Sequence, residues 1–283
     1  MRVGGVPEHY NAPIHRLMAN LRGEIEWVSF PSGTGAMLDA LDRNEIDLAI
    51  LLTEGVSKHA LTTGKTRIVG TFVNNPLPWG VHVKPDGPLS SMEVLNSRIG
   101  DLTFGISRLG SGSHLMAIVH AASLGPNSVP RFKIVDNMKG ARDAMVNGEI
   151  DVFLWDITTA DIFAREGVWK VVGTVSGDWP AFVFATQATT NNTDDIESLI
   201  QKIKEEAIEL KQDRSKTSVV FLMETFGISE TQAGDFITSI EWNCTRSVDK
   251  EALLRVVDAL EGANIIPNRS DIYSIDSIVL QDR

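Results

Sequence analysis

The sequence has little of what several common protein classes require. Cys244 is the only cysteine, so neither an intramolecular disulfide nor a cysteine-based zinc site can form. We expect its thiol to be buried among apolar side chains. No run of about 18 apolar residues is present, so no membrane insertion is expected. The start, Met1 to Val6, lacks a basic stretch followed by an apolar one. The sequence therefore predicts a cytoplasmic protein, or a periplasmic one if a signal peptide has been removed.

Positive charge is also in short supply. The chain has 26 lysines and arginines against 37 aspartates and glutamates, which gives a formal net charge of -11. This balance works against binding to nucleic acid or to anionic membrane surfaces, so we expect neither as a partner. Hydrophobic residues make up 43% of the 283 residues, enough for an ordinary globular core in one large domain or two lobes.

What the sequence does contain is an alternation of short apolar runs with helical patterns. Ile46–Leu52, for example, is apolar except for Asp47, as expected of a strand buried on both faces. A helical pattern over Gly35–Arg43 precedes it. The alternation predicts an α/β protein with parallel sheets. The expected strands are 24–30, 46–52, 67–73, 102–107, 132–136, 150–155 and 169–175.

The last third of the chain predicts helices instead. Asp194–Arg214 is a long amphipathic pattern with isoleucines and leucines on one face. Ser229 and Gln232 have the spacing of a capping box at the start of a second helix. Ser247 can cap a third, which would end near Gly262. We therefore expect a helical C-terminal tail.

One short pattern occurs twice. Asp39-Ala40, four residues and then Glu45-Ile46-Asp47-Leu48 correspond to Asp143-Ala144, four residues and then Glu149-Ile150-Asp151-Val152. Each copy predicts a helix, a turn and a buried strand. Asn44 and Gly148 occupy the position where a left-handed helix stop needs Asn or Gly. The recurrence favours two lobes of related architecture, although so short a match can also arise by chance.

Two helix-breaking segments suggest where the lobes join. Asn74–Pro78 and Ser176–Pro180 each contain proline and each lie where one strand–helix pattern ends and another strand begins. We expect the chain to cross between lobes at both. Lobe 2 would then be residues 79–179, and lobe 1 would combine residues 1–78 and 180–283.

Ligands of open α/β sheets bind beyond the carboxyl ends of the strands, so the loops expected there give the candidate binding residues. In lobe 1 these are Glu8, His9, Tyr10, Ser32, Thr34, Gly35 and Thr53. In lobe 2 they are Ser107, Arg108, Ser111, Gly112, Ser113, His114, Asn137, Trp155 and Asp156, together with Trp79 at the crossing.

These residue types suit recognition of a small anion or zwitterion. Glycines and hydroxyls at a helix start let a ligand approach free N–H groups, although ordinary helix capping explains the same residues. Arg108 can pair with a carboxylate, sulfonate or phosphate, or lie on the surface. The histidines can donate to a ligand or serve the structure. Trp79 and Trp155 can stack on a planar ligand or pack in the core.

Two stretches resemble a known family. Phe30-Pro31-Ser32-Gly33-Thr34-Gly35 through Ala49, and Phe104–His114, are similar to the two lobe signatures of substrate-binding proteins of nitrate, sulfonate and taurine transporters. A yeast family that makes the thiamine pyrimidine precursor shares this fold. The resemblance implies a type II periplasmic-binding-protein-like fold with two lobes, a hinge and a ligand in the cleft. By position it points to Ser32, Thr34, Ser111, Ser113 and His114.

The sequence thus predicts a protein that closes on a small anionic or zwitterionic organic solute, of a pyrimidine-like or sulfonate-like type, with no cofactor, metal or catalytic residue. A transporter is a partner only if the chain is exported. The alternative is an enzyme of thiamine-pyrimidine or related metabolism on the same fold. His9, His114, Glu8 and Glu54 would be available to it, but no nucleophile–base pair is evident. A regulatory effector-binding domain is a third interpretation, without a recognisable helix-turn-helix.

Overall fold

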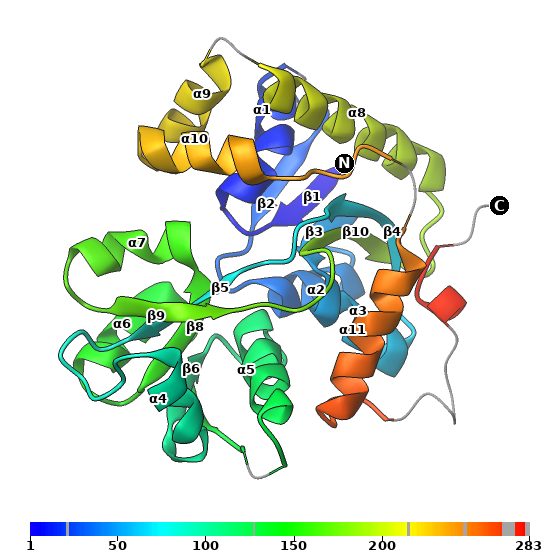
Figure 1. Cartoon of the computed structure of the whole chain (residues 1–283). Helices are drawn as coiled ribbons and strands as arrows, with labels where there is room; N and C mark the ends of the chain where they lie inside the picture. Colours follow the sequence, from blue (N-terminus) through cyan, green and yellow to red (C-terminus); the bar gives the residue numbers. More distant parts are fainter. Residues whose placement is uncertain (21–22, 127, 214–215, 246–247, 268–274, 281–283) are drawn as a thin grey trace. The chain divides into compact units, whose positions relative to one another are not determined.

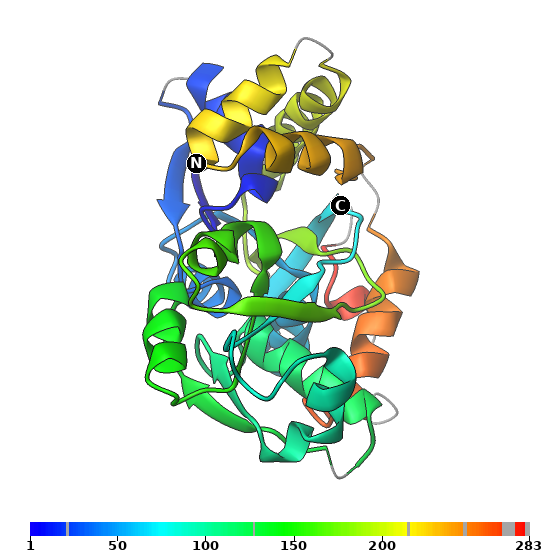
Figure 2. The ribbon, with the colours of Figure 1, turned by 60° about the vertical axis from the view of Figure 1, so that its left-hand side comes forward.

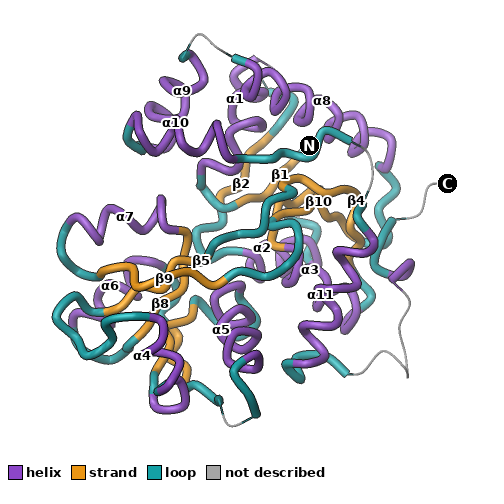
Figure 3. Tube along the Cα trace, viewed as in Figure 1, coloured by secondary structure: helices purple, strands orange, loops and turns teal. Residues whose placement is uncertain are grey.

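The computed structural model describes residues 1–20, 23–126, 128–213, 216–245, 248–267 and 275–280. Its contacts divide the chain into two compact units. Unit 1 comprises Met1–Pro76, Trp179–Val257 and the last residues of the chain, and unit 2 comprises Leu77–Asp178 and Asp258–Pro267. Each unit has its own five-stranded sheet, drawn in orange in Figure 3.

The sheet of unit 1 has the strand order β2-β1-β3-β10-β4. Strands β1, β2 and β3 are parallel, whereas β10 runs antiparallel to both β3 and β4. Every residue of β3 is buried, as its apolar sequence predicts. The strands are β1 (Arg2–Gly5), β2 (Glu26–Ser29), β3 (Leu48–Leu52), β4 (Thr66–Val73) and β10 (Phe182–Gln187).

The helical tail of unit 1 forms largely as the sequence predicts. The long helix α8 buries Ile196, Leu199, Ile200 and Ile203. It packs beside α1, and Figures 1 and 2 show α9 and α10 close to both. The capping box at Ser229 is confirmed, whereas Ser247 lies outside the described residues. The helices are η1 (His9–Asn11), α1 (Ala12–Asn20), α2 (Thr34–Asp42), α3 (Thr53–Thr63), α8 (Thr193–Gln212), α9 (Thr217–Phe226), α10 (Glu230–Ser239), α11 (Lys250–Gly262), whose residues from Asp258 onwards belong to unit 2, and η4 (Ile275–Ser277).

Unit 2 repeats the arrangement of unit 1 with the strand order β7-β6-β8-β5-β9. Strands β6, β7 and β8 are parallel, and β5 is antiparallel to β8 and β9. The strands are β5 (Trp79–Val83), β6 (Thr103–Ile106), β7 (Arg131–Ile134), β8 (Val152–Asp156) and β9 (Lys170–Val175). The helices are α4 (Met92–Ser97), η2 (Ile99–Asp101), α5 (Gly112–Ser123), α6 (Met138–Val146) and α7 (Ile157–Arg165).

The expectation of parallel sheets holds for four strands of each sheet, whereas the fifth, β10 or β5, runs antiparallel. β10 begins at Phe182, which pairs with Leu52 at the end of β3. β5 begins at Trp79, which pairs with Asp156 at the end of β8. Each strand therefore enters its sheet at the edge where its neighbour ends. With no crossover helix to carry the chain back, it has to run in the opposite direction.

The repeated sequence pattern corresponds to repeated structure. Asp47 Oδ2 accepts a hydrogen bond from Arg2 N at 2.7 Å, and Asp151 Oδ2 accepts one from Thr103 N at 2.8 Å. In both units this aspartate ties the start of the third parallel strand to the start of the first. Asn44 and Gly148 both have left-handed backbones, with φ of 57° and 70°. The two lobes that the pattern favours therefore share one architecture.

The lone cysteine departs from expectation. Cys244 is exposed rather than buried, and its Sγ lies 3.4 Å from the carbonyl oxygen of Trp242. It lies in the irregular segment between α10 and α11, where Trp242 and Asn243 supply the buried side chains. The thiol is therefore turned away from the core.

Candidate functional site

Each sheet has a switch point at which ligands of open α/β proteins bind. In unit 1 the chain passes from β1 through α1 to β2 on one side, then back past β1 to β3 on the other. Right-handed connections then place α1 and α2 on opposite faces, so the segments that follow β1 and β3 diverge. The same order places a switch point between β6 and β8 in unit 2. The candidate residues lie around these two points.

The segment after β1 holds three of the candidates in an aromatic environment. Glu8, His9 and Tyr10 are all buried. The His9 ring lies 4.4 Å from that of Phe236 and 4.6 Å from that of Tyr10. The carbonyl oxygen of Tyr10 accepts a hydrogen bond from the Trp242 indole at 3.1 Å. The histidine is therefore held by packing against rings.

The Ser32–Gly35 loop leads into α2. Gly33 is the N-cap residue, with φ of 80°, a conformation that suits glycine, and it supplies no side-chain cap. Thr34 is buried, and its Oγ1 accepts a hydrogen bond from Leu52 N at 3.2 Å, while Ser32 and Gly35 are half-buried. Thr34 thus joins this loop to the end of β3, beside the switch point.

The start of α3 follows β3 directly and is also uncapped by a side chain, because its N-cap residue is Leu52. Thr53 Oγ1 donates to the carbonyl oxygen of Pro180 at 2.5 Å. Glu54, in the first turn, is only 1% exposed. Its Oε2 accepts from the Trp179 indole at 3.2 Å, and its Oε1 has no hydrogen-bond partner among the described residues. Burial raises the pKa of Glu54 to about 7.

Glu54 was not among the candidate binding residues, and the sequence pattern offered one signal for it. A carboxyl group two residues after a fully apolar strand lies at the end of a buried segment, where water is scarce. His82 was also missed. It is completely buried in β5, its Nδ1 lies 3.1 Å from the carbonyl oxygen of Phe153, and burial lowers its pKa. Its Nε2 has no partner among the described residues.

In unit 2 the loop after β6 forms a hydroxyl cluster. Ser113 Oγ accepts from Ser107 N at 3.3 Å and lies 3.1 Å from Ser111 Oγ. Ser111 caps α5, whose first residue is Gly112, by accepting from His114 N at 3.4 Å. His114 Nδ1 in turn accepts from Gly110 N at 2.9 Å. Arg108 lies in the same loop and is half-buried.

The remaining candidates follow β7 and β8 or begin β5. Asn137 caps α6 by accepting from Gly140 N at 3.1 Å. Asp156 caps α7, accepting from both the N–H and the hydroxyl of Thr159 at 2.8 Å. Trp155 stacks on Phe153, and its indole N–H is buried without a partner among the described residues. Trp79 is 5% exposed and pairs with Asp156 across the sheet. For all candidates, contact with a ligand stays a prediction.

Helix capping distinguishes the two switch points. The helices α5, α6 and α7 of unit 2 each receive a side-chain cap, from Ser111, Asn137 and Asp156. In unit 1, α2 and α3 begin without a side-chain cap from their N-cap residues Gly33 and Leu52. The partial positive charge at a helix start attracts anions, and an uncapped start leaves room for one from outside.

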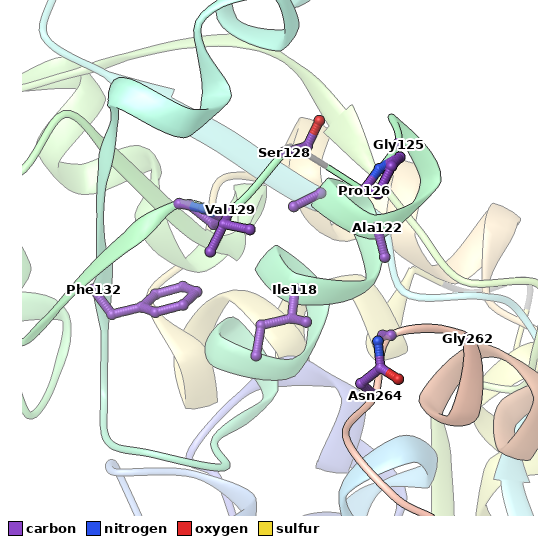
Figure 4. A pocket seen from close by; sticks show the side chains of 12 residues that line it. Ile118, Ala122, Gly125, Pro126, Ser128, Val129, Phe132, Gly262 and Asn264 are labelled. Carbon is purple, nitrogen blue, oxygen red and sulfur yellow. The ribbon is translucent and has the colours of Figure 1, made fainter. Parts of the chain in front are cut away.

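A hollow of about 490 Å³ in unit 2 is unrelated to these loops. Figure 4 shows it between the end of α5 and the strand β7, where Ile118, Ala122, Val129 and Phe132 line it beside Gly262 and Asn264. α5 starts at the carboxyl end of β6, so its last turn and the start of β7 lie at the opposite edge of the sheet from Ser107 and Asn137. The hollow is therefore not the candidate site.

The described residues include no cluster of three or more His, Cys, Asp or Glu side chains that could hold a metal ion. In the same part of the chain, no helix combines the length and the apolar character needed to cross a membrane.

Comparisons with known proteins agree on the fold. A family model described as Ca3427-like PBP matches residues 90–175, which lie in unit 2. The Candida albicans CA3427 gene product, described as having the generic periplasmic binding protein fold, is similar at 24% identity and a TM-score of 0.86, covering 99% of this chain and 95% of that one.

Two sulfonate-binding proteins are similar at lower identity. The alkanesulfonate-binding protein SsuA from Xanthomonas axonopodis pv. citri, bound to MOPS, has 17% identity and a TM-score of 0.74, covering 95% and 94% of the two chains. The periplasmic aliphatic sulphonate binding protein SsuA from Escherichia coli has 17% identity and a TM-score of 0.69, covering 100% and 92%. No curated protein matches in sequence. The chain has a periplasmic-binding-protein-like fold that resembles sulfonate-binding proteins.

Proposed function

We propose that this chain binds a small organic anion or zwitterion at the switch points of its two sheets, closes on it and releases it unchanged. The observation that carries the proposal is the start of α2, beside the switch point of unit 1, where the N-cap residue Gly33 supplies no side-chain cap. Backbone N–H groups at such starts bind a sulfonate, carboxylate or phosphate without needing a nearby cation.

The second unit supplies complementary groups. Ser107, Ser111 and Ser113 gather hydroxyls in one loop, and Arg108 adds a positive charge. The solved neighbours named for sulfonates support an anionic head group of this type, and one of them holds MOPS. Ligand contacts from both units would favour a closed form, so binding would shift the population towards it.

The test is a titration of the purified full chain with propane-1-sulfonate and with MOPS, followed by calorimetry. We expect saturable binding of at least one of them and recovery of the compound unchanged by mass spectrometry. Small-angle scattering of the saturated protein should give a smaller radius of gyration than that of the free protein. Absence of binding, or appearance of a new product, contradicts the proposal.

Two arginines of unit 2, Arg108 and Arg131, provide a test variant and its matched control. Arg108→Ala should weaken binding by about 2 kcal/mol, or roughly thirtyfold, because a charged contact in a closed site is lost. Arg131→Ala changes the same residue type in unit 2 at the start of β7, the opposite edge of the sheet, and should leave the affinity unchanged. Equal affinities of the two variants would remove Arg108 from the site.

A further inference from the structure

The hollow of about 490 Å³ in unit 2 has a floor of small side chains (Figure 4). The floor is one face of α5, to which Ile118, Ala121 and Ala122 contribute. These residues are three and four positions apart, so their side chains lie on the same side of the helix. The two alanines are short, and they leave open space over the last turns of α5.

The first wall of the hollow is the segment that joins α5 to β7. It contributes Pro126, Val129 and Pro130. Proline rings fix the backbone φ angle, so this wall has little freedom to collapse onto the floor. Where the wall meets β7, Arg131 N donates a hydrogen bond to the carbonyl oxygen of Leu102 at 2.9 Å. The wall is thereby attached to the sheet.

The second wall is the end of α11, where Gly262, Ala263 and Asn264 line the hollow. The backbone turns left-handed at Asn264, with φ of 54°, and Ile265 N donates back to the carbonyl oxygen of Leu260 at 2.8 Å. This hydrogen bond closes the helix end, and the Leu260 side chain is completely buried. Both walls are therefore held by the backbone, and the hollow is a preformed feature of the fold, as ligand pockets usually are.

The lining of the hollow is apolar and carries no charge. None of the described residues that line it is Asp, Glu, Lys, Arg or His, although charged residues make up 22% of the chain. Phe132 is half-buried, and Val129 is 69% exposed at the opening. The polar side chains of the lining are those of Ser128 and Asn264. A charged ligand would lose its hydration here without gaining a partner, so the lining favours an uncharged one.

We propose that this hollow is a second binding site, which takes a small uncharged molecule with an aromatic or alicyclic body and one hydrogen-bonding group. Its volume lies in the range of small-molecule pockets, roughly 300 to 1,000 Å³. The ligand body packs against Ile118, Val129 and Phe132, and burial of apolar surface stabilises the complex. Ser128 or Asn264 takes the hydrogen-bonding group. The site lies at the edge of the sheet opposite the candidate site, and it does not depend on the proposed function.

The experiment uses N-phenyl-1-naphthylamine, an uncharged aromatic compound with one N–H group whose fluorescence rises when it leaves water. Titration of the full chain measures the affinity and the stoichiometry, and we expect saturable binding of a single molecule per chain. Val129→Asp places a charge in the first wall and should weaken binding about tenfold or more, because the carboxylate would be desolvated against the probe. Val146→Asp is the matched control. Val146 is 55% exposed at the end of α6, outside the hollow, so this variant should keep the wild-type affinity.

A second pair of variants tests the hollow by filling it. Ala122→Trp places a large ring over the floor, where the probe would lie, and should also weaken binding about tenfold or more. Because Ala122 is exposed, the core does not have to adjust to the larger side chain. Ala19→Trp makes the same change at an exposed alanine of α1 in unit 1, and should leave the affinity unchanged.

The outcomes decide whether the probe binds in the hollow. Absence of saturable binding by the wild-type chain overturns the inference. Equal affinities of Val129→Asp and Val146→Asp, or of Ala122→Trp and Ala19→Trp, overturn it as well. An excess of propane-1-sulfonate should leave the probe bound, and displacement would assign the probe to the candidate site instead. Failure of sulfonates to bind contradicts only the proposed function, because the two pairs of variants locate the probe by themselves.

Discussion

The two units have the same sheet arrangement but differ at the helix that follows the third parallel strand. β3 and β8 are equivalent strands, and α3 and α7 follow them. In unit 2, Asp156 caps α7 through two hydrogen bonds of 2.8 Å to Thr159. In unit 1 the equivalent residue is Leu52, and the nearby carboxyl group belongs to Glu54, two residues further on. The Asp156 carboxylate caps its helix, whereas the Glu54 carboxyl group is buried and one of its oxygens has no hydrogen-bond partner among the described residues.

This difference teaches how function is added to a duplicated architecture. The ties that build the sheets are kept in both units, as Asp47 and Asp151 show by accepting the first backbone N–H of β1 and β6. The helix starts at the carboxyl edge are where the units diverge. In unit 2 the N-cap residues of α5, α6 and α7 cap these starts with their side chains, whereas in unit 1 the N-cap residues of α2 and α3 do not. We expect selection for ligand binding to account for this departure.

The largest effect expected from this contrast is on the pH dependence of stability. The pKa of Glu54 is raised from 4.5 to about 7 by burial, so the folded chain holds this proton more tightly than the unfolded chain. The stability that it contributes is complete below about pH 4.5 and is lost as the pH rises towards 7. Glu54→Gln carries no such proton. Its free energy of unfolding, relative to wild type, should rise by about 2 to 3 kcal/mol between pH 5 and pH 8.

Denaturant unfolding at pH 5, 6, 7 and 8 measures this difference. Glu45→Gln serves as control, since Glu45 is exposed and paired with Arg43, which lowers its pKa. That variant should not gain stability relative to wild type as the pH rises. A flat difference for Glu54→Gln would show that its carboxyl group is solvated, and would remove the contrast with Asp156.

The cap of α7 should give an effect of intermediate size. Asp156→Ala removes both hydrogen bonds to Thr159 and should lower the free energy of unfolding by about 1 to 2 kcal/mol. Asp156→Asn should restore most of it, because asparagine caps about as well as aspartate. Thr159→Val removes only the hydroxyl bond and should cost less than Asp156→Ala. If Asp156→Ala leaves the free energy of unfolding unchanged, the Asp156 carboxylate does not stabilise the fold. The two units would then be more alike than their hydrogen bonds indicate.

The sequence predicted the parts of the fold that depend on local pattern. β3 was visible as an apolar run, α8 as a stripe of isoleucine and leucine, and the stops at Asn44 and Gly148 from residue type. The strands β5 and β10 were not among the expected strands, and their antiparallel direction was missed as well, because it depends on how the chain re-enters each sheet. Local periodicity contains no information about that choice.

The candidate site, too, has residues that local sequence pattern predicts and residues that only the folded structure reveals. Ser111 was placed at a helix start because a hydroxyl there has a physical signature, and the structure shows it capping α5. Glu54 was missed because its importance comes from complete burial and from the Trp179 indole, which is 125 residues away in sequence. Glutamate is usually exposed, so its residue type predicts the opposite of what the fold does with it.

The smallest expected effect concerns the turns that precede β3 and β8, where the units use different residues for one conformation. Asn44 has φ of 57° and Gly148 has φ of 70°, both in the left-handed region. Glycine adopts this region without steric cost, and asparagine at a modest one. Asn44→Gly should therefore change the free energy of unfolding by only a few tenths of a kcal/mol, since relief of strain offsets the added freedom of the unfolded chain. Gly148→Asn should change the free energy of unfolding by a similarly small amount with the opposite sign. Gly148→Ala has no side-chain amide to support the turn, so it should lower the free energy of unfolding by about 1 kcal/mol. Denaturant unfolding of the three variants gives the order directly. A large loss in Asn44→Gly would mean that the Asn44 side chain does more than permit the turn, and the two turns would then not be equivalent.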